Sequence, residues 1–373
     1  MKLLIDCTSL KGWTGKPTGI QRVIAELARS SKSVMPGSHC VVFDAEKHAH
    51  IYDVEKSTLG QNVPISKGDV ILTASANWDL PDHHANLIEF QSRGCHVIPL
   101  LYDIIPLVLP HSYGPGFSQI YKKWFVETLG YAELAFSISR STSRDIINWA
   151  KNARINCPDL YTIRLGDNLP ILDPKPSQII KDIETPFVLC VGTIEYRKNH
   201  RRLLDVYRYL IEQHKYNLPL LVIVGKQGWL DYEIENQIEN DPRLASKVVV
   251  LSDLSDDDLA HLYQHAQMTV FPSLYEGWGL PIAESLAYGT PCIASGTSSM
   301  REIDSNLVIH INPLDTIGWA EAIKYLCENN IDREQLQKKI KAIYKTTKWD
   351  DTAIQIFEIL KCRFTEVADE NIF

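Results

Sequence analysis

The chain has 373 residues and a formal net charge of −8 at pH 7, with 45% hydrophobic and 23% charged residues. These proportions are ordinary for a globular protein, and the length is sufficient for two domains. The acidic balance argues against a dominant nucleic-acid-binding surface, so we expect no nucleic-acid partner.

No targeting or membrane-spanning segment is evident in the sequence. The first residues, MKLLIDCTSL, reach Asp6 after three apolar residues, whereas a secretory signal needs a longer apolar stretch. No stretch approaches the roughly 20 apolar residues of a membrane helix. We therefore expect a cytoplasmic protein. The eight cysteines are scattered without a C-x-x-C pair, which favours buried, reduced thiols over a zinc site.

The first half of the chain alternates short apolar runs with amphipathic helical patterns, which is typical of parallel α/β units. Thr18 is positioned to cap a first helix, whose apolar residues share one face: Ile20, Val23, Ile24 and Leu27. Strands are predicted at residues 3–6, 40–43, 70–73, 96–102, 134–138 and 161–165.

A polar, proline-bearing segment at residues 167–177 (DNLPILDPKPS) is the best candidate for an interdomain linker. The pattern then restarts, and strands are predicted at residues 187–191, 218–224, 248–251, 269–271 and 291–294. The sequence thus predicts an α/β protein with two doubly wound halves that face each other across a cleft. Ligands of such sheets bind beyond the carboxyl ends of the strands.

The segment with the clearest chemistry is residues 271–302, FPSLYEGWGLPIAESLAYGTPCIASGTSSMRE. A strand is followed by a glycine loop, and Pro281 suits the first turn of the next helix. Gly277 and Gly279 allow the backbone to approach a ligand closely. Free amides at the start of this helix can hold a phosphate group.

Two glutamates belong to the same segment, Glu276 on the loop and Glu284 in the helix. If both face the cleft, they can accept hydrogen bonds from sugar hydroxyls. The alternative is a solvated helix start, in which both carboxylates interact favourably with the helix dipole.

A second segment, VGTIEYRKN, places a basic pair at the end of a strand. The strand ends at Gly192, and Arg197 and Lys198 stand directly before a helix that Asn199 can cap. Adjacent cations in this position suit a diphosphate, whose leaving-group charge they would stabilise. The alternative is a solvated basic pair.

Together these segments resemble the signature of glycosyltransferase family 4, through EGWGLPIAES followed by AYGTPCIAS. The resemblance implies the GT-B fold of two Rossmann-like domains and a reaction that retains the configuration at the anomeric carbon. It further implies that Glu284 binds the ribose hydroxyls and that Glu276 contacts the hydroxyls of the donor sugar.

The same resemblance assigns the donor diphosphate to two groups of residues. Backbone around Trp278, Gly279 and Leu280 would meet the sugar and the diphosphate. Arg197 and Lys198 would contact the phosphates.

Weaker parallels lie elsewhere in the chain. The glycine loop at residues 14–22 resembles the amino-terminal loop of the family, with Gly19 as the matching residue. Asp103 follows a strand end at which many members carry a histidine, but Tyr102 fills that position here. Asp103 would orient acceptor or sugar hydroxyls, or it caps the next turn. Lys226, in the loop VGKQGW, would lie near the nucleotide or in a solvated loop.

The family architecture implies an amino-terminal acceptor-side domain at residues 1–172 and a nucleotide-sugar domain at residues 173–350. It also implies a final helix, residues 351–373, that crosses back to the first domain. The chain shows no D-x-D motif of the metal-nucleotide kind, so we expect no metal and no cofactor.

The sequence therefore predicts a retaining glycosyltransferase that passes a hexose from a nucleotide sugar to a hydroxyl of a glycan or lipid-linked glycan. GDP-mannose is our first choice of donor, because YDIIP, TIEYRKN and VGKQGW look like segments of bacterial mannosyl- or rhamnosyltransferases of surface-polysaccharide assembly. UDP- and dTDP-sugars stay open, as does peripheral membrane association. The alternatives are a nucleotide-sugar 2-epimerase of the same fold and a catalytically silent nucleotide-sugar-binding scaffold.

Overall fold

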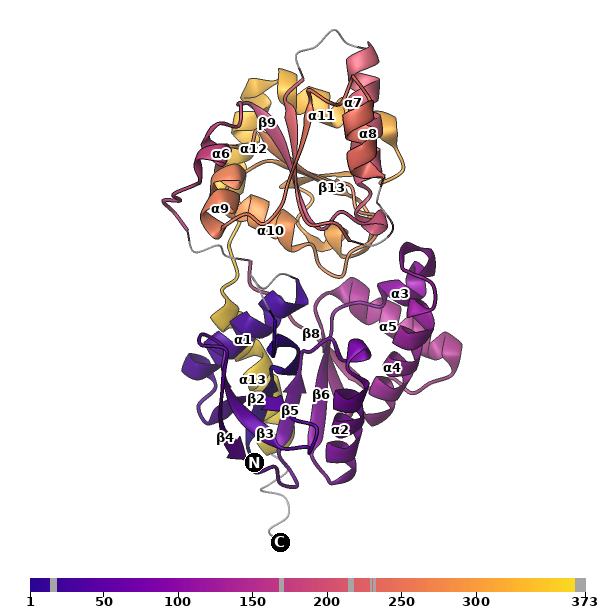
Figure 1. The fold of residues 1–373 in the computed structure, drawn as a ribbon, viewed down its shortest axis with the longest axis vertical. Coiled ribbons are helices and arrows are strands. Elements are labelled where there is room, and N and C mark those ends of the chain that lie inside the picture. The colour runs from indigo at the N-terminus through magenta and orange to yellow at the C-terminus, as the bar shows by residue number, and fades with distance from the viewer. Residues whose placement is uncertain (14–18, 168–170, 214–217, 229, 231–232, 366–373) are drawn as a thin grey trace. The chain divides into compact units, whose positions relative to one another are not determined.

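The computed structural model describes residues 1–13, 19–167, 171–213, 218–228, 230 and 233–365. The chain folds into two compact units (Figure 1). Unit 1 comprises Met1–Leu107, Gly116–Gly166 and Thr347–Phe373, and unit 2 comprises Val108–Pro115 and Asp167–Thr346. The segment 167–177, predicted as a linker, begins where unit 2 resumes.

Unit 1 is built on an eight-stranded sheet in the order β4-β3-β2-β1-β5-β6-β7-β8. The last six strands in this order are parallel, and β3 and β4 are added antiparallel at one edge. The strands are β1 (Leu3–Asp6), β2 (Ser38–Phe43), β3 (Ala49–Asp53), β4 (Thr58–Val63), β5 (Val70–Thr73), β6 (His96–Leu101), β7 (Leu134–Ser137) and β8 (Asp159–Thr162).

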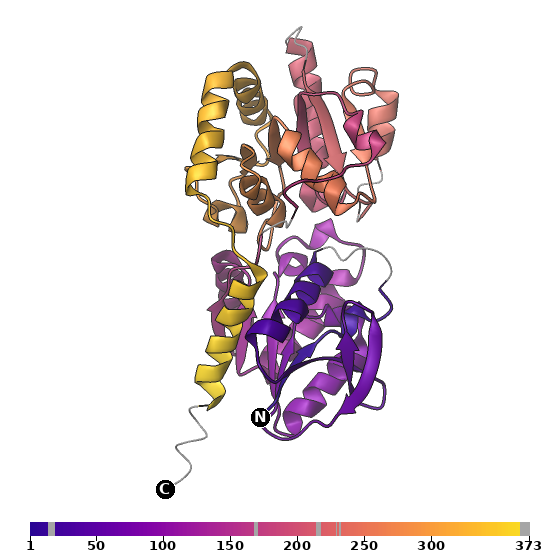
Figure 2. The same cartoon turned by 90° about the vertical axis from the view of Figure 1, so that its left-hand side faces the viewer.

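Helices cover this sheet with apolar faces. Leu87 and Phe90 of α2 pack on alternate residues of the strands, including Leu4 and Ile71. The final helix α13 packs along α1, as Figure 2 shows in yellow and indigo. The helices of unit 1 are α1 (Ile20–Val34), α2 (Pro81–Ser92), α3 (Ile105–Val108, which continues into unit 2), α4 (Phe117–Tyr131), α5 (Arg140–Ala153) and α13 (Trp349–Thr365), with short 3-10 turns η1 (Thr8–Leu10) and η2 (Asn77–Asp79).

Unit 2 has a six-stranded, fully parallel sheet in the order β11-β10-β9-β12-β13-β14. After β9 the chain adds β10 and β11 on one side of that strand, and it then adds β12, β13 and β14 on the other side. The topological switch point of this unit therefore lies between β9 and β12. The strands are β9 (Phe187–Val191), β10 (Leu220–Val224), β11 (Val248–Leu251), β12 (Met268–Phe271), β13 (Cys292–Ser295) and β14 (Val308–Ile311).

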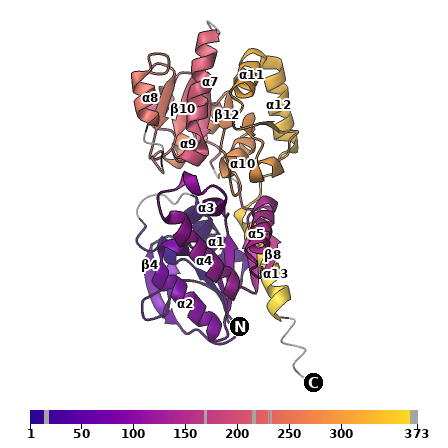
Figure 3. The same cartoon turned by 90° about the vertical axis from the view of Figure 1, so that its right-hand side faces the viewer.

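Both faces of the second sheet are covered, because alternate residues of its strands point to opposite sides. Val188 packs in a core with α7 and α11, whereas Leu189 packs in another with α6 and α9. Figure 3 shows α7 and α8 beside β10. The helices are α6 (Gln178–Lys181), α7 (His200–Gln213), α8 (Ile234–Asn240), α9 (Asp256–His265), α10 (Leu280–Ala287), α11 (Thr316–Glu328) and α12 (Asn330–Ile343), with 3-10 turns η3 (Pro110–Ser112), η4 (Tyr196–Lys198) and η5 (Ser298–Glu302).

The sequence patterns located the buried parallel strands and missed edge strands. β4, which is mostly exposed, and the half-buried edge strand β14 were not predicted, nor was β3. The strand expected at 161–165 was misplaced: β8 is Asp159–Thr162, and the apolar residues Ile163 and Leu165 are buried beyond its end. Ser255 and Asp258 form a capping box at the start of α9. Thr18 lies outside the described residues. No described helix is long and apolar enough to cross a bilayer.

Candidate active site

The candidate site lies at the switch point of unit 2. Strands β9 and β12 are hydrogen-bonded neighbours, with Val188 opposite Met268 and Leu189 opposite Thr269. The segment after β9 carries Arg197 and Lys198, and the loop after β12 carries Glu276. Parallel strands present their carboxyl ends at the same edge, so these residues meet although they are about 80 positions apart in sequence.

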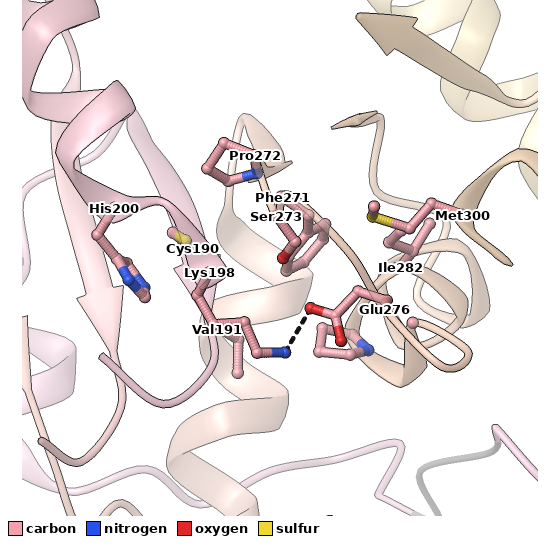
Figure 4. A pocket seen from close by; sticks show the side chains of 12 residues that line it. Cys190, Val191, Lys198, His200, Phe271, Pro272, Ser273, Glu276, Ile282 and Met300 are labelled. Carbon is pink, nitrogen blue, oxygen red and sulfur yellow. Dashed lines mark hydrogen bonds and ion pairs between the residues drawn. The ribbon is translucent and has the colours of Figure 1, made fainter. Parts of the chain in front are cut away.

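Arg197 and Lys198 both hold the carboxylate of Glu276. Arg197 donates to Oε2 of Glu276 at 2.8 Å, and Lys198 donates to Oε1 at 2.6 Å. Figure 4 shows the second contact as a dashed line. Arg197 also pairs with Glu195 at 2.7 Å. Two cations and two carboxylates therefore balance in charge within one cluster.

The carboxyl group of Glu276 stays ionised despite its burial. Burial by itself raises its pKa, but Lys198 and Arg197 outweigh that effect and lower the pKa to about 2. A carboxylate kept charged in this way is a strong hydrogen-bond acceptor for hydroxyl groups.

Two serines of η5 hold the glycine loop after β12 through hydrogen bonds to its backbone. The Glu276 backbone N–H donates to Ser298 Oγ at 2.9 Å. The Ser299 hydroxyl lies 2.8 Å from the carbonyl oxygens of both Glu276 and Trp278, and its proton serves one of them at a time. Gly279, at φ 116°, then caps α10, in a backbone region that favours glycine.

The hydrogen bonds thus hold the turn that leads into α10, which consists of Gly277, Trp278, Gly279 and Leu280. Leu280 is the first residue of this helix, and Pro281 follows in its first turn, as predicted from the sequence.

Glu284 is buried in α10, where its Oε2 accepts a hydrogen bond of 3.0 Å from the Tyr263 hydroxyl. The tyrosine comes from α9, so one helix orients the carboxylate of another. Glu284 does not line the pocket that contains Glu276. The structure therefore joins Arg197 and Lys198 to Glu276 but holds Glu284 in a separate contact.

A small pocket lies at the switch point (Figure 4). It is lined by Cys190, Val191, Lys198, His200, Phe271, Pro272, Ser273, Glu276, Gly279, Pro281, Ile282 and Met300. His200 is 1% exposed, and neither ring nitrogen has a hydrogen-bond partner among the described residues. Burial, with a smaller effect of Lys198, lowers the pKa of His200 to about 3, so the imidazole is neutral.

Glycines bring β9 and β10 close together at this edge. Gly192 directly follows β9 with φ 152°, and a Cβ there would lie 3.7 Å from the Lys198 side chain. A Cβ on Gly225 would lie 1.9 Å from the carbonyl oxygen of Gly192. Asn199 stands directly before α7, and its side-chain amide donates to the carbonyl oxygens of Pro272 and Pro313.

The other predicted site residues make contacts of their own. Lys226 forms a 2.5 Å ion pair with Asp253, and both side chains are 68% exposed. Gly19 caps α1 in unit 1. Asp103, also in unit 1, accepts the Ile105 backbone N–H at 2.9 Å, as a residue that caps a turn does.

Tyr102, at the position where the family often has histidine, is buried in unit 1. Its hydroxyl donates to the carbonyl oxygen of Ala74 at 2.8 Å. Burial also raises the pKa of Tyr102 far above its usual value. The hydroxyl is therefore a structural donor in this structure.

Sequence reasoning missed Glu195, His200, Tyr263 and the two serines. Glu195 stands two residues before Arg197, which was the available signal for a charge partner. The serines and Tyr263 gave no such signal, since their contacts depend on packing between elements remote in sequence.

Comparison with known proteins identifies the domain that holds this site. Residues 174–343 match the family model of glycosyl transferases group 1. This segment of the chain is therefore similar to group 1 glycosyl transferases. The match spans every strand of unit 2 and the whole cluster around Glu276.

The chain is also similar to the serotype-specific mannosyltransferase WbdA of Escherichia coli. The two are 28% identical over 326 residues, which cover 81% of this chain. The chain spans only 38% of the length of that relative.

Solved structures show the same fold over almost the whole chain. Sucrose-phosphate synthase from Thermosynechococcus elongatus gives a TM-score of 0.68 at 16% identity, covering 98% of this chain and 100% of the other. Anabaena Alr3699/HepE in complex with UDP-glucose gives 0.65 at 16% identity, covering 99% and 100%. The predicted GT-B fold class is confirmed, with a mostly parallel sheet in unit 1 and a fully parallel sheet in unit 2.

Proposed function

We propose that this protein is a retaining glycosyltransferase that transfers a hexose from a nucleotide sugar to a hydroxyl of a glycan or lipid-linked glycan. One observation carries the proposal: Arg197 and Lys198 converge on Glu276 at the switch point, beside the hydrogen-bonded turn that starts α10. Cations and free helix amides suit a diphosphate, and a charged carboxylate suits sugar hydroxyls.

In the proposed reaction the bond between the anomeric carbon and the diphosphate oxygen breaks while the acceptor oxygen bonds to the same face of that carbon. The departing diphosphate oxygen takes the acceptor proton, so no protein nucleophile is needed. Arg197 and Lys198 would move from Glu276 toward the diphosphate and stabilise its growing charge. We assign the reaction no metal requirement.

GDP-mannose is the donor we propose first, because the similar protein WbdA is named as a mannosyltransferase. The similar Anabaena protein was solved in complex with UDP-glucose, which keeps a UDP-sugar as the main competitor. We place the reaction on the cytoplasmic side, where a lipid-linked acceptor would require peripheral membrane contact.

The test uses the purified full chain with GDP-mannose, UDP-glucose, UDP-N-acetylglucosamine and dTDP-rhamnose, with EDTA present throughout. A thermal-shift screen comes first, since a nucleotide at 100 times its dissociation constant adds about 2.7 kcal/mol of stability. Transfer with retained configuration by NMR, or slow donor hydrolysis, supports the proposal. Epimerised sugar without transfer would establish the epimerase, and binding without any turnover would establish a scaffold.

A further inference from the structure

A cluster of side chains that could bind a metal ion lies in unit 1, at the turn between β2 and β3. Asp44 Oδ2 lies 2.8 Å from Nε2 of His50 and 3.3 Å from Nδ1 of His48. The three candidate ligand atoms all lie within 4.8 Å of one another. The two imidazole rings are perpendicular, with centroids 6.3 Å apart.

The turn itself fixes this arrangement. The Asp44 N–H donates to the His48 carbonyl at 3.1 Å, and the His48 N–H donates to Asp44 Oδ1 at 2.8 Å. The backbone therefore occupies Oδ1 and leaves Oδ2 directed at the imidazoles. His48 directly precedes β3, His50 is the second residue of that strand, and both side chains reach Oδ2 of Asp44.

The neighbouring charges do not compete for this carboxylate. Lys47 is paired with Glu89 of α2. Asn86, also on α2, donates to the Asp44 backbone carbonyl at 3.3 Å, which leaves the side chain to the histidines.

The two separations between Asp44 and the histidines can be compared with those of a tetrahedral metal site. Imidazole nitrogen and carboxylate oxygen bind Zn²⁺ at about 2.0–2.2 Å, which places ligand atoms of a tetrahedron about 3.3 Å apart. The Asp44–His48 separation already has this value, and the Asp44–His50 separation needs to open by about 0.5 Å. The two imidazole nitrogens lie within 4.8 Å of each other, and rotation of the half-exposed His48 ring would bring them to the tetrahedral distance. His48 is 54% exposed at its side chain, which leaves access for an ion and for water as the fourth ligand.

We propose that Asp44, His48 and His50 form a site for a divalent transition ion of the zinc class, which ties the end of β2 to the start of β3. This ion would be structural and independent of the proposed transfer reaction. The cysteine spacing and the missing D-x-D motif could not reveal it, because the ligands are two histidines and one carboxylate.

The test is calorimetric titration of ZnCl₂ into the full, tag-free chain after chelator treatment and removal of the chelator. We expect one ion per chain, and a rise of about 5 °C in the melting temperature of unit 1 at saturating Zn²⁺. His50→Gln, whose amide still donates to Asp44, should weaken binding at least tenfold, as should Asp44→Asn. His96→Gln is the matched control, because His96 pairs with Glu133 at 3.3 Å outside this cluster.

Exposed thiols are the competing ligands, namely Cys157 and Cys362. The Cys157→Ser/Cys362→Ser variant should bind Zn²⁺ as the wild type does, and Co²⁺ should give visible bands without a thiolate charge-transfer band. Circular dichroism checks the folding of each variant. Absence of binding to the wild type, or equal binding by wild type and His50→Gln, overturns the proposal.

Discussion

Lys198 Nζ lies 2.6 Å from Oε1 of Glu276, and this ion pair joins the segments that follow the two central strands of unit 2. Glu276 thus pairs with Arg197 and Lys198, the two cations that the proposed reaction needs for a diphosphate. A bound donor would have to share or displace these contacts, which makes each partner of the pair testable by a separate measurement.

Replacement of Glu276 by Gln should separate binding from turnover. Because the carboxylate has a pKa of about 2, the substitution removes a full negative charge at neutral pH. We expect the affinity for a nucleoside diphosphate to rise about tenfold, a change of about 1.4 kcal/mol. Turnover should fall about a hundredfold through loss of the sugar contact. Calorimetry and an initial-rate assay check the two effects, and weaker diphosphate binding would contradict this account.

Arg197→Ala should lower turnover by about 10² to 10³, because a charge that stabilises the leaving group is lost. It should also cost about 1–3 kcal/mol of folding stability, since Glu195 and Glu276 lose a partner. Arg197→Lys keeps the charge and should restore much of the stability but little of the rate. Arg201→Ala is the control: its side chain is 50% exposed, and a stability change within about 0.5 kcal/mol is expected. Unchanged turnover in Arg197→Ala would remove this residue from the site.

The ribose role of Glu284 can be tested with paired nucleotides. Glu284→Gln should weaken GDP binding by about 1.5–3 kcal/mol, the value of a hydrogen bond to a charged group. Binding of 2′,3′-dideoxy-GDP should be equal in variant and wild type, because the hydroxyls are gone. Tyr263→Phe removes the donor that orients Glu284 and should have a smaller effect of the same sign. Equal losses for both nucleotides would show that Glu284 acts through packing.

Gly225→Ala should destabilise unit 2 by about 3 kcal/mol, because the new methyl group would overlap the Gly192 carbonyl oxygen at 1.9 Å. Gly130→Ala is the matched control within a helix: nothing lies within 4 Å of the added atom. That variant should be more stable by about 0.5–1 kcal/mol. Urea unfolding of both variants measures the difference, and an unchanged midpoint for Gly225→Ala would contradict the close approach of β9 and β10.

His200 should make unit 2 less stable in mild acid. Its pKa is about 3 in the folded protein and ordinarily 6.5, so between these values the unfolded state binds one more proton. The stabilising contribution is complete above pH 6.5 and is lost as the pH falls toward 3. From pH 7 to 5 this loss amounts to about 2 kcal/mol. Urea unfolding of His200→Leu should show a smaller decrease over that interval, and identical pH profiles would mean that His200 is hydrated or paired.

The buried elements could be derived from the chain alone. β9 and β10 are continuous apolar runs, as strands covered on both faces must be, and Pro281 marks the start of α10 in its own sequence. The same local patterns marked Arg197 and Lys198 in one segment and Glu276 in another, and the family resemblance assigned all three to one donor. Edge strands such as β4 carry no such pattern, since solvent accepts almost any polar residue there.

Packing between segments remote in sequence determined the contacts that the chain alone did not reveal. The contact of Tyr263 with Glu284, the serines that hold the loop after β12, and the close approach of Gly225 to Gly192 each join parts of the chain that local propensity treats separately. The charge state of Glu276 belongs to the same class, because burial and two cations act on it in opposite directions and only their distances decide the balance.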